Sequence, residues 1–221
     1  MIADKVRNVA GFLRDDEAEL LFSLAKNKKV IVEIGSFQGK STICLALGTK
    51  GKVYAIDPHT GSKEHGQVNT LSQFKENIFK AGMAKKIIPL VMVSRLAVNK
   101  INQPIDLLFI DGAHDYKSVK QDFDDWFPKV VNGGTVAFHD TISWPGPKRV
   151  VADKVFLSNK FKNVGVVGSI TFGEKTNEFG FFDFLKNRYV YCTKVLREKL
   201  ANVSLPHPLH NALKNIYYAV Q

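Results

Sequence analysis

Short apolar runs alternate along the chain with longer segments that mix apolar and polar residues. The short runs predict buried strands over residues 30–34, 52–57, 86–93, 106–110 and 135–139. The segments between and around them predict helices over residues 17–26, 40–49, 68–81, 115–127 and 147–158. Such alternation of strands and helices is typical of a parallel sheet with helices on both faces.

The pattern also indicates where the sheet has its edges. Pro89 lies in the third predicted strand and places it near an edge or in an irregular strand, because proline cannot donate to a sheet ladder. Residues 164–173 predict two short strands that reverse near Gly168, which fits an antiparallel edge. We therefore expect an α/β fold with a seven-stranded, mostly parallel sheet.

The last part of the chain has no strand pattern. Residues 181–221 predict a helical tail that is broken around Pro206 and Pro208. We expect a single domain over residues 1–180 and a helical extension over residues 181–221. Two roles are open for the extension: it caps the functional site, or it pairs with another subunit in a homo-oligomer.

Residues 30–42, VIVEIGSFQGKST, predict a strand, a glycine-containing turn and a helix start. This geometry directs backbone N–H groups at a small ligand beyond the carboxyl edge of the sheet. Gly35 and Gly39 enclose three residues, which is too few for the phosphate-binding spacing G-x-x-x-x-G-K-[ST], and G-x-G-x-x-G for a dinucleotide is absent here. The spacing E-x-G-x-x-x-G-x-S, from Glu33 to Ser41, matches the loop of class I methyltransferases that use S-adenosylmethionine. From this loop alone, an ordinary strand–helix turn remains an equal alternative.

Asp57 ends the second predicted strand, KVYAID. An acidic residue about 20 positions beyond a glycine loop is typical of a site that grips ribose hydroxyls. A carboxylate accepts both hydroxyl hydrogens, which no neutral side chain does. A P-loop protein has no use for this residue, so Asp57 favours an adenosyl ligand.

Two polar clusters lie at the ends of later strands. Asp111 and His114 follow the strand DLLFI, and His139 and Asp140 follow TVAF. The carboxyl ends of parallel strands meet at one edge of a sheet, so these four side chains should converge near the glycine loop. Asp115 reads instead as the cap of the next helix.

The net charge of the chain does not change the expected class of ligand. The chain of 221 residues has a formal net charge of +10, but its lysines are scattered and no basic run is interleaved with exposed aromatic residues. Nucleic acid is therefore not the expected partner, although a basic surface would also steer anionic substrates such as nucleotide-sugars or phospho-sugars.

Cysteine usage and hydropathy favour the cytoplasm. Cys44 and Cys192 have no metal or redox spacing and are expected to be unpaired core thiols in a reducing compartment. No apolar run approaches the ~20 residues of a membrane span, and the first residues, MIADKVRN, lack the apolar core of a signal peptide. We expect a cytoplasmic protein with no membrane association.

The segments VEIGSFQGKST, VYAID and LLFIDGAHDYKSVKQDFDDWFPKVVNGGTVAFHDT resemble the class I methyltransferases called methyltransferase domain 24. That group is similar to metal-dependent sugar O-methyltransferases and, more remotely, to catechol O-methyltransferases. The resemblance covers roughly residues 15–175 and implies a Rossmann-like fold and S-adenosyl-L-methionine as cofactor. It assigns the following residues to the cofactor: Glu33, Gly35, Ser36, Gly39 and Ser41 around the methionine part, Asp57 on the ribose, Ser94 on the adenine side, and Asp111.

The resemblance also implies a divalent metal, Mg²⁺ or Mn²⁺, held by Asp111, His139 and Asp140. Metal-dependent relatives carry an acidic pair where this chain has His139-Asp140. Mg²⁺ prefers oxygen ligands, whereas a histidine ligand favours Mn²⁺, Fe²⁺ or Zn²⁺. His139 is therefore expected either as the third ligand or as a residue behind the ligands.

Methyl transfer from a sulfonium requires an aligned and activated acceptor oxygen. We expect Asp111, through the metal, and His114, as general base, to activate a hydroxyl of a small acceptor, a sugar or a saccharide-decorated metabolite. His59 and His65 are expected as exposed loop residues, and Trp144 either as a wall of the acceptor pocket or as a packing residue.

Two other classes of function remain open from the sequence. One is a P-loop-like phosphotransferase with Lys40 and Ser41 on a phosphate. The other is a non-catalytic module that binds S-adenosylmethionine or nucleic acid. The short loop and Asp57 argue against the first, and the polar clusters argue against the second.

Overall fold

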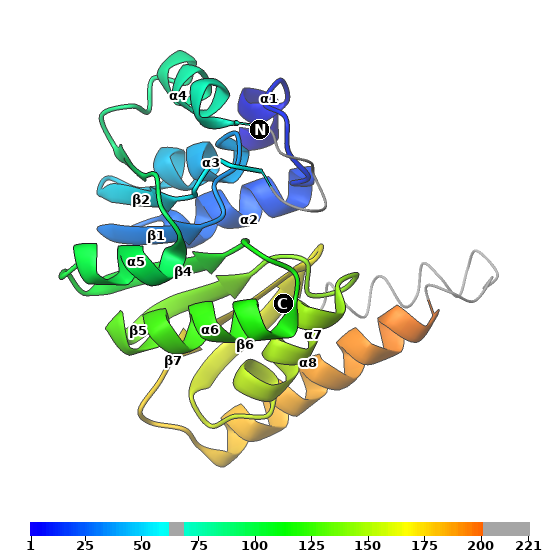
Figure 1. The fold of residues 1–221 in the computed structure, drawn as a ribbon. Helices are drawn as coiled ribbons and strands as arrows, with labels where there is room; N and C mark the ends of the chain where they lie inside the picture. Colours follow the sequence, from blue (N-terminus) through cyan, green and yellow to red (C-terminus); the bar gives the residue numbers. More distant parts are fainter. Residues whose placement is uncertain (62–68, 201–221) are drawn as a thin grey trace.

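The computed structural model describes residues 1–61 and 69–200. Within these residues the chain forms a seven-stranded sheet of strand order β3-β2-β1-β4-β5-β7-β6 (Figure 1). The first five strands are parallel neighbours, and β7 runs antiparallel between β5 and β6. The strands are β1 (Val30–Ile34), β2 (Lys52–Ile56), β3 (Ile87–Leu90), β4 (Ile105–Ile110), β5 (Val130–Phe138), β6 (Phe161–Val167) and β7 (Ile170–Lys175).

Helices cover both faces of this sheet (Figure 1). The longer ones lie where the sequence predicts them, within a few residues at each end. They are α1 (Ile2–Val6), α2 (Asp15–Ala25), α3 (Lys40–Gly48), α4 (Leu71–Lys80), α5 (Ser94–Ala97), α6 (Tyr116–Trp126), α7 (Pro145–Val151) and α8 (Phe181–Leu200), with short 3₁₀ turns at Val98–Lys100 and Phe127–Lys129 and a π-helical turn at Ala152–Phe156. The predicted fold class is thus confirmed.

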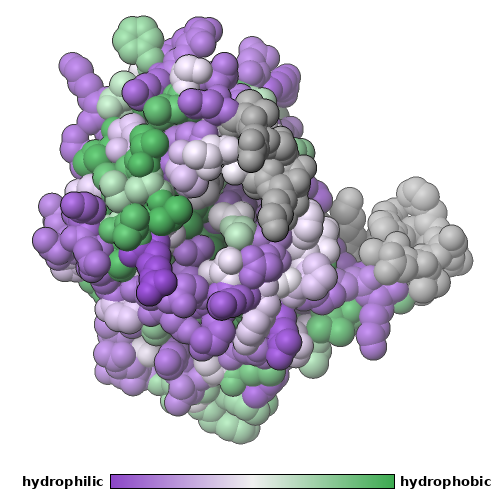
Figure 2. All heavy atoms as spheres, in the orientation of Figure 1, coloured by the Kyte–Doolittle hydropathy of each residue, from purple (hydrophilic) through white to green (hydrophobic). Residues whose placement is uncertain are grey.

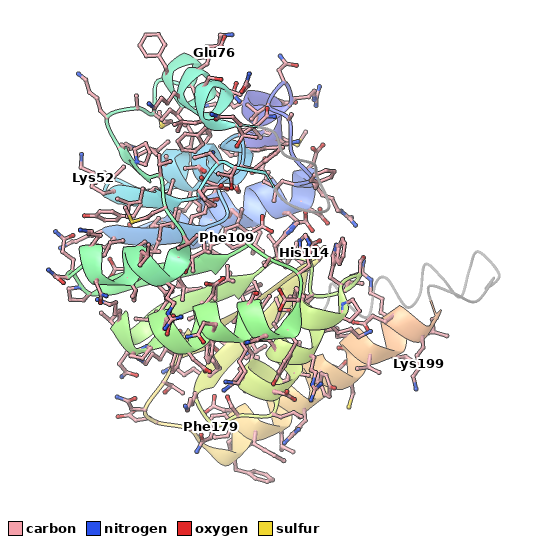
Figure 3. All side chains as sticks on the ribbon, viewed as in Figure 1. Lys52, Glu76, Phe109, His114, Phe179 and Lys199 are labelled. Atoms are coloured by element: carbon pink, nitrogen blue, oxygen red, sulfur yellow. The ribbon has the colours of Figure 1, made fainter. Side chains whose placement is uncertain are left out.

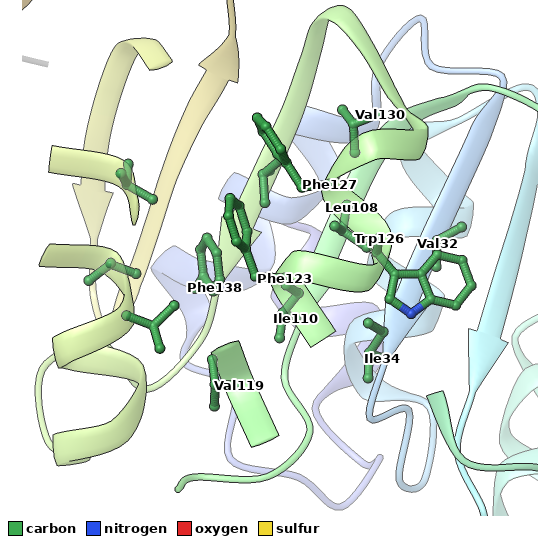
Figure 4. Close-up of a cluster of buried hydrophobic side chains, with 14 of the residues drawn as sticks. Val32, Ile34, Leu108, Ile110, Val119, Phe123, Trp126, Phe127, Val130 and Phe138 are labelled. Atoms are coloured by element: carbon green, nitrogen blue, oxygen red, sulfur yellow. The ribbon is translucent and has the colours of Figure 1, made fainter. Parts of the chain in front are cut away.

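Each face of the sheet has its own hydrophobic core. On one face, α6 packs its apolar stripe against β1 and β4, with Trp126 and Phe123 near Ile34 and Phe138 (Figure 4). On the other face, α2, α3 and α4 cover the same strands, and Phe74 of α4 belongs to that core. Since both faces are covered, the central strands consist mainly of apolar residues, and the buried Glu33 in β1 is an exception.

Three predicted elements differ from the observed ones. β5 begins at Val130 and not at residue 135, because the chain bulges through Gly133, whose φ is +80°, before regular pairing with β4 resumes at Thr135. The helix predicted over 147–158 begins two residues earlier and turns π-helical from Ala152. The third strand is shorter than predicted, but it is an edge strand as Pro89 indicates.

α8 lies along β6 on the outside of the sheet, and its Val190 contributes to the core (Figure 1). Residues 201–221, including Pro206 and Pro208, lie outside the described residues. Cys44 is a buried free thiol as predicted, whereas Cys192 is exposed on α8, so the prediction of a second core thiol is wrong. In the described parts of the chain, no helix combines the length and the apolarity that crossing a membrane requires.

Candidate active site

The strand order reverses direction at β1, which pairs with β2 on one side and with β4 on the other. In an open parallel sheet a ligand crevice forms beyond the carboxyl ends of the strands at such a point. The segments that follow β1, β2, β4 and β5 carry nearly all of the predicted site residues. The fold therefore brings four separate stretches of sequence to one edge.

The glycine loop packs tightly against the end of β4. Gly35 has a φ of +89°, and a Cβ at this position would lie 2.0 Å from the carbonyl oxygen of Asp111. Gly39 also has a φ of +89° and immediately precedes α3, against the ring of Phe74. Both glycines are thus required by backbone conformation and by close approach. The loop touches the polar cluster behind β4 directly.

Glu33 is buried in β1 and is held by two hydroxyl groups from α3. Ser41 donates a hydrogen bond of 2.5 Å to one carboxylate oxygen, and Thr42 donates to the other. Burial raises the pKa of Glu33 to about 8, against the opposing effect of these two hydrogen bonds. Ser36 is buried too, and its hydroxyl has no hydrogen-bond partner among the described residues.

We expect Glu33 to make stability fall as pH rises from about 5 to about 8. Its pKa is about 8 in the folded protein against an ordinary value of 4.5. Between these values the folded state keeps a proton that the unfolded chain has released, so folding is favoured at the acidic end and weakened toward pH 8. Urea unfolding of the ligand-free protein measures this, and the wild type should lose stability relative to Glu33→Gln over that window. Parallel curves for the two proteins would refute the assignment.

Asp57 follows β2 and ties the glycine loop to the loop after β2. One carboxylate oxygen accepts from the backbone N–H of Phe37 at 2.8 Å, and the other accepts from that of His59 at 2.7 Å. Phe37 and His59 both have positive φ, at +43° and +53°. Strained backbone at two loop tips beside one carboxylate is typical of a ligand site.

His59 is not the exposed loop residue that the sequence predicts. Its side chain is buried, with Nδ1 2.9 Å from the hydroxyl of Thr70 and the ring 5.2 Å from that of Phe74. The ring packs there because Phe74 of α4, a core residue, and the hydroxyl of Thr70 provide an apolar contact and a hydrogen-bond partner. His65 lies outside the described residues.

Ser94 begins α5, beyond the end of β3, and its hydroxyl accepts a hydrogen bond of 2.8 Å from the indole nitrogen of Trp126. The side chain of Asp122 in α6 also hydrogen-bonds to Ser94, and burial raises the pKa of Asp122 to about 6. No motif in the sequence indicates Asp122. Val93 and Leu96, next to Ser94 in the chain, are exposed hydrophobic residues, and Figure 2 shows a hydrophobic patch on this otherwise mainly hydrophilic face.

The two predicted polar clusters do meet. One ligand atom each from Asp111, His139 and Asp140 lies within 4.8 Å of the others. Nδ1 of His139 lies 3.1 Å from a carboxylate oxygen of Asp111 and 3.4 Å from one of Asp140. His114, in the loop between β4 and α6 (Figure 3), places Nε2 3.0 Å from Asp140 and stacks on Trp144 with ring centroids 4.2 Å apart.

Local structure fixes the positions of this cluster. Asp140 has a φ of +58°, an uncommon conformation that turns its carboxylate back toward His114 and His139. Asp115 caps α6 through its hydrogen bond with the N–H of Ser118, as predicted. Gly146 of α7 lies so close to the carbonyl of His114 that a Cβ would be 2.1 Å away. The loop that carries His114 is thus held from both sides.

Glu17, which the sequence analysis placed only at a helix start, completes the cluster. It lies in the first turn of α2, and one carboxylate oxygen is 3.3 Å from Nε2 of His139. Burial opposes its ionisation, but hydrogen bonds from His139 and from the backbone of Arg14 and Ser169 bring the pKa of Glu17 to about 2. No spacing in the sequence indicates this contact, which spans 122 positions.

The cluster is electrostatically suited to a cation. Burial on its own would lower the pKa of His139, but Asp111, Asp140 and Glu17 outweigh it and hold that pKa well above its usual range. Burial opposes the ionisation of Asp140, yet hydrogen bonds from His114 and His139 keep its pKa below the usual range. Burial raises the pKa of Asp111. Three carboxylates around one imidazole attract positive charge.

The donor set also fits a divalent metal. One imidazole nitrogen and two carboxylates, already converging at the open edge of the sheet, are ligands that Mn²⁺, Fe²⁺ or Zn²⁺ accepts. A cavity of about 330 Å³ adjoins this cluster on the side of α8. Its lining includes Phe12, Arg14, Glu17, His139, Asp140, Ile142, Ser143, Ser169, Arg197 and Glu198.

Comparisons with known proteins agree with this geometry. A family model described as a methyltransferase domain matches residues 32–141, which contain the glycine loop, Asp57 and both polar clusters. An uncharacterised protein, y4gI of Sinorhizobium fredii, is 32% identical over 124 residues, 50% of this chain, but the match spans only 13% of the length of that relative. An uncharacterised protein, R132 of Acanthamoeba polyphaga mimivirus, is 29% identical over 70% of this chain and 79% of its own length.

Solved structures share the fold. The O-methyltransferase TomG of Streptomyces achromogenes, in complex with S-adenosylmethionine, has a TM-score of 0.57 at 18% identity over 73% of this chain and 80% of its own. The two proteins are alike in the arrangement of the sheet and the helices. The likeness to TomG shows that this chain has the Rossmann-like methyltransferase fold. The family match shows that the chain, through residues 32–141, belongs to the methyltransferase domain family.

Proposed function

We propose that the protein is an S-adenosylmethionine-dependent O-methyltransferase that methylates a hydroxyl of a small acceptor, a sugar or a saccharide-decorated metabolite, with the help of a divalent metal. The observation that carries this proposal is the convergence of Asp111, His114, His139 and Asp140 beside the glycine loop. The residues proposed to bind the cofactor, to hold a cation and to act as a base would thereby be adjacent. TomG, a structural neighbour, is an O-methyltransferase in complex with S-adenosylmethionine.

The cofactor would lie across the ends of β1, β2 and β4. The glycine loop would receive the methionine part, and the buried Ser36 hydroxyl, which has no hydrogen-bond partner among the described residues, is available there. Asp57 would receive the ribose hydroxyls. Ser94 and Asp122 would face the adenine edge, and the apolar surface of Val93 and Leu96 would pack against its plane. Ser41 would act indirectly, because its hydroxyl is committed to Glu33.

The polar cluster would bind and activate the acceptor. Asp111, His139 and Asp140 would hold the metal, and His114 would take the proton that the acceptor hydroxyl loses. When bound, the cofactor supplies a methyl group already activated on a sulfonium, and the metal lowers the pKa of a coordinated hydroxyl. Asp140 links the two tasks, since its carboxylate contacts both histidines.

The cavity beside the cluster supports a hydroxylated acceptor. Its lining includes the polar residues Ser143, Ser169, Arg14 and Arg197 and the apolar residues Phe12 and Ile142. Hydroxyl and guanidinium groups match the donors and acceptors of a sugar. Its volume of about 330 Å³ suits a small molecule.

The phosphotransferase alternative has weaker support. Lys40, which would be its phosphate-binding residue, packs against Gly11, and its ammonium lies 3.4 Å from the carbonyl oxygen of that residue. A P-loop lysine instead reaches into the loop.

The direct test is methyl transfer itself. The protein is incubated with S-adenosylmethionine, Mn²⁺ or Mg²⁺, and a panel of monosaccharides, nucleotide-sugars and catechols, and S-adenosylhomocysteine release is measured. We expect acceptor-dependent release that a chelator abolishes. If the chelator leaves S-adenosylhomocysteine release unchanged, the proposed role of a divalent metal is wrong. If only nitrogen acceptors are methylated, the assignment as an O-methyltransferase is wrong.

We expect Asp57→Ala to weaken S-adenosylmethionine binding by about 100-fold or more, because each of the two charge-assisted hydrogen bonds to the ribose contributes about 1.5–3 kcal/mol. Calorimetric titration measures the affinity. An S-adenosylhomocysteine analogue without ribose hydroxyls is the control: it should bind the wild type and the variant equally weakly. An undiminished affinity of Asp57→Ala for S-adenosylmethionine would exclude Asp57 from the ribose site.

A further inference from the structure

A buried carboxylate lies on the far side of His139 from the other two. Nδ1 of the ring faces Asp111 and Asp140, at 3.1 and 3.4 Å, whereas Nε2 faces Glu17 at 3.3 Å. The imidazole ring of His139 thus lies between Asp111 and Asp140 on one side and Glu17 on the other. Only one of its two nitrogens is directed at the place where a cation would sit.

Glu17 has almost no freedom to move away from this ring. The oxygen near His139 also accepts from the backbone N–H of Arg14 at 2.9 Å. The other oxygen accepts from the backbone N–H and the hydroxyl of Ser169, at 2.6 and 2.8 Å. Gly168, with a φ of +59°, makes space for the carboxylate of Glu17, because a Cβ at this position would lie 2.3 Å from it. Three segments of the chain converge to hold one carboxylate.

We propose that Glu17 is a positioning residue for the metal: it accepts the proton of His139 Nε2 and so presents Nδ1 as a metal ligand beside Asp111 and Asp140. Histidines that bind metals generally donate their other ring N–H to a carboxylate or carbonyl, which fixes the tautomer and raises ligand basicity. The inference rests on the metal-assisted function proposed above and adds to it the identity of the ligand atom.

The same arrangement selects the class of metal. A fixed imidazole nitrogen with two carboxylates suits a first-row transition ion better than Mg²⁺, which prefers an all-oxygen shell and retains its waters. Glu17 supports the nitrogen ligand and therefore strengthens this preference. The site should bind Mn²⁺ more tightly than Mg²⁺.

Metal affinity of the full-length protein tests the proposal without any turnover. Mn²⁺ binding is followed by electron paramagnetic resonance for the wild type, for Glu17→Gln, and for Asp16→Asn, a change in the same turn of α2 at a residue that pairs with Arg14 near the surface. We expect Glu17→Gln to weaken Mn²⁺ binding about 10- to 100-fold. Asp16→Asn should bind Mn²⁺ as the wild type does, and S-adenosylmethionine affinity should be the same in all three proteins.

The outcomes separate the two proposals. A wild type that binds no Mn²⁺ overturns both the metal-assisted function and the role of Glu17. Equal Mn²⁺ affinity in the wild type and Glu17→Gln overturns the role of Glu17 alone. A loss of S-adenosylmethionine affinity in parallel with Mn²⁺ would mean that Glu17 only maintains the fold, and would likewise overturn its role at the metal.

A second measurement needs no variant and therefore holds even if Glu17→Gln does not fold. Long-range ¹H–¹⁵N NMR of the wild type loaded with Zn²⁺ reports which nitrogen of His139 carries the proton. The proposal requires a protonated Nε2 and a metal-bound Nδ1. A metal-bound Nε2 would overturn it.

Discussion

Replacing Asp140 by asparagine should lower turnover by on the order of 10³-fold or more while leaving S-adenosylmethionine binding intact. The carboxylate is one of the three proposed metal ligands and contacts both His114 and His139. Loss of its charge removes a ligand and leaves His114 without its ionic partner, and metal activation of a hydroxyl contributes several kcal/mol. Turnover with saturating acceptor and calorimetric cofactor affinity measure the two quantities separately.

The choice of asparagine matters because Asp140 has a φ of +58°. Asparagine tolerates this left-handed conformation, whereas alanine adds backbone strain. Asp140→Ala should therefore show the same loss of turnover and, in addition, a lower melting temperature. Turnover that survives in both variants would contradict the metal model. Loss of cofactor binding in Asp140→Asn would show that the residue belongs to the cofactor site instead.

Replacing His114 by alanine should lower kcat by about 10²- to 10⁴-fold, the usual contribution of a general base. Its Nε2 contacts Asp140, and its ring stacks on Trp144 beside the cavity. Metal and cofactor affinities should not change, because His114 is not among the three converging ligand atoms. The measurement is kcat as a function of pH, alongside both affinities.

His114→Gln is the matched variant for this prediction. Glutamine keeps a polar side chain near Asp140 but cannot take a proton, so both variants should lose kcat. Both variants should also lose the fall of kcat at acidic pH that protonation of the His114 imidazole causes in the wild type. Retention of wild-type kcat in either variant would mean that another group, or the metal alone, activates the acceptor.

Much of the fold could be predicted because local and global signals agree. The apolar strands, the glycine turn after β1 and the proline in the edge strand β3 all follow from sequence pattern, and the structure confirms them. Proximity of the polar residues after β4 and β5 follows as well, since neighbouring parallel strands end at the same edge. The roles of these residues stay predictions until they are measured.

What the sequence did not indicate depends on contacts between distant residues. Glu17 reaches His139 only because α2 packs beside the β6–β7 turn, and it has no motif of its own. Asp122 meets Ser94 through the packing of α6 on the sheet. The burial of His59 and the early start of β5 both depend on positive-φ positions, which a single sequence does not reveal.

Calorimetric titration of the full chain with S-adenosylmethionine and, separately, with ATP determines whether the crevice beyond β1, β2 and β4 is an S-adenosylmethionine site. Each titration is run with and without Mg²⁺ and Mn²⁺. We expect micromolar binding of S-adenosylmethionine and no heat of binding with ATP. Binding of ATP alone would contradict it and would make Lys40 and Ser41 the centre of a phosphate site.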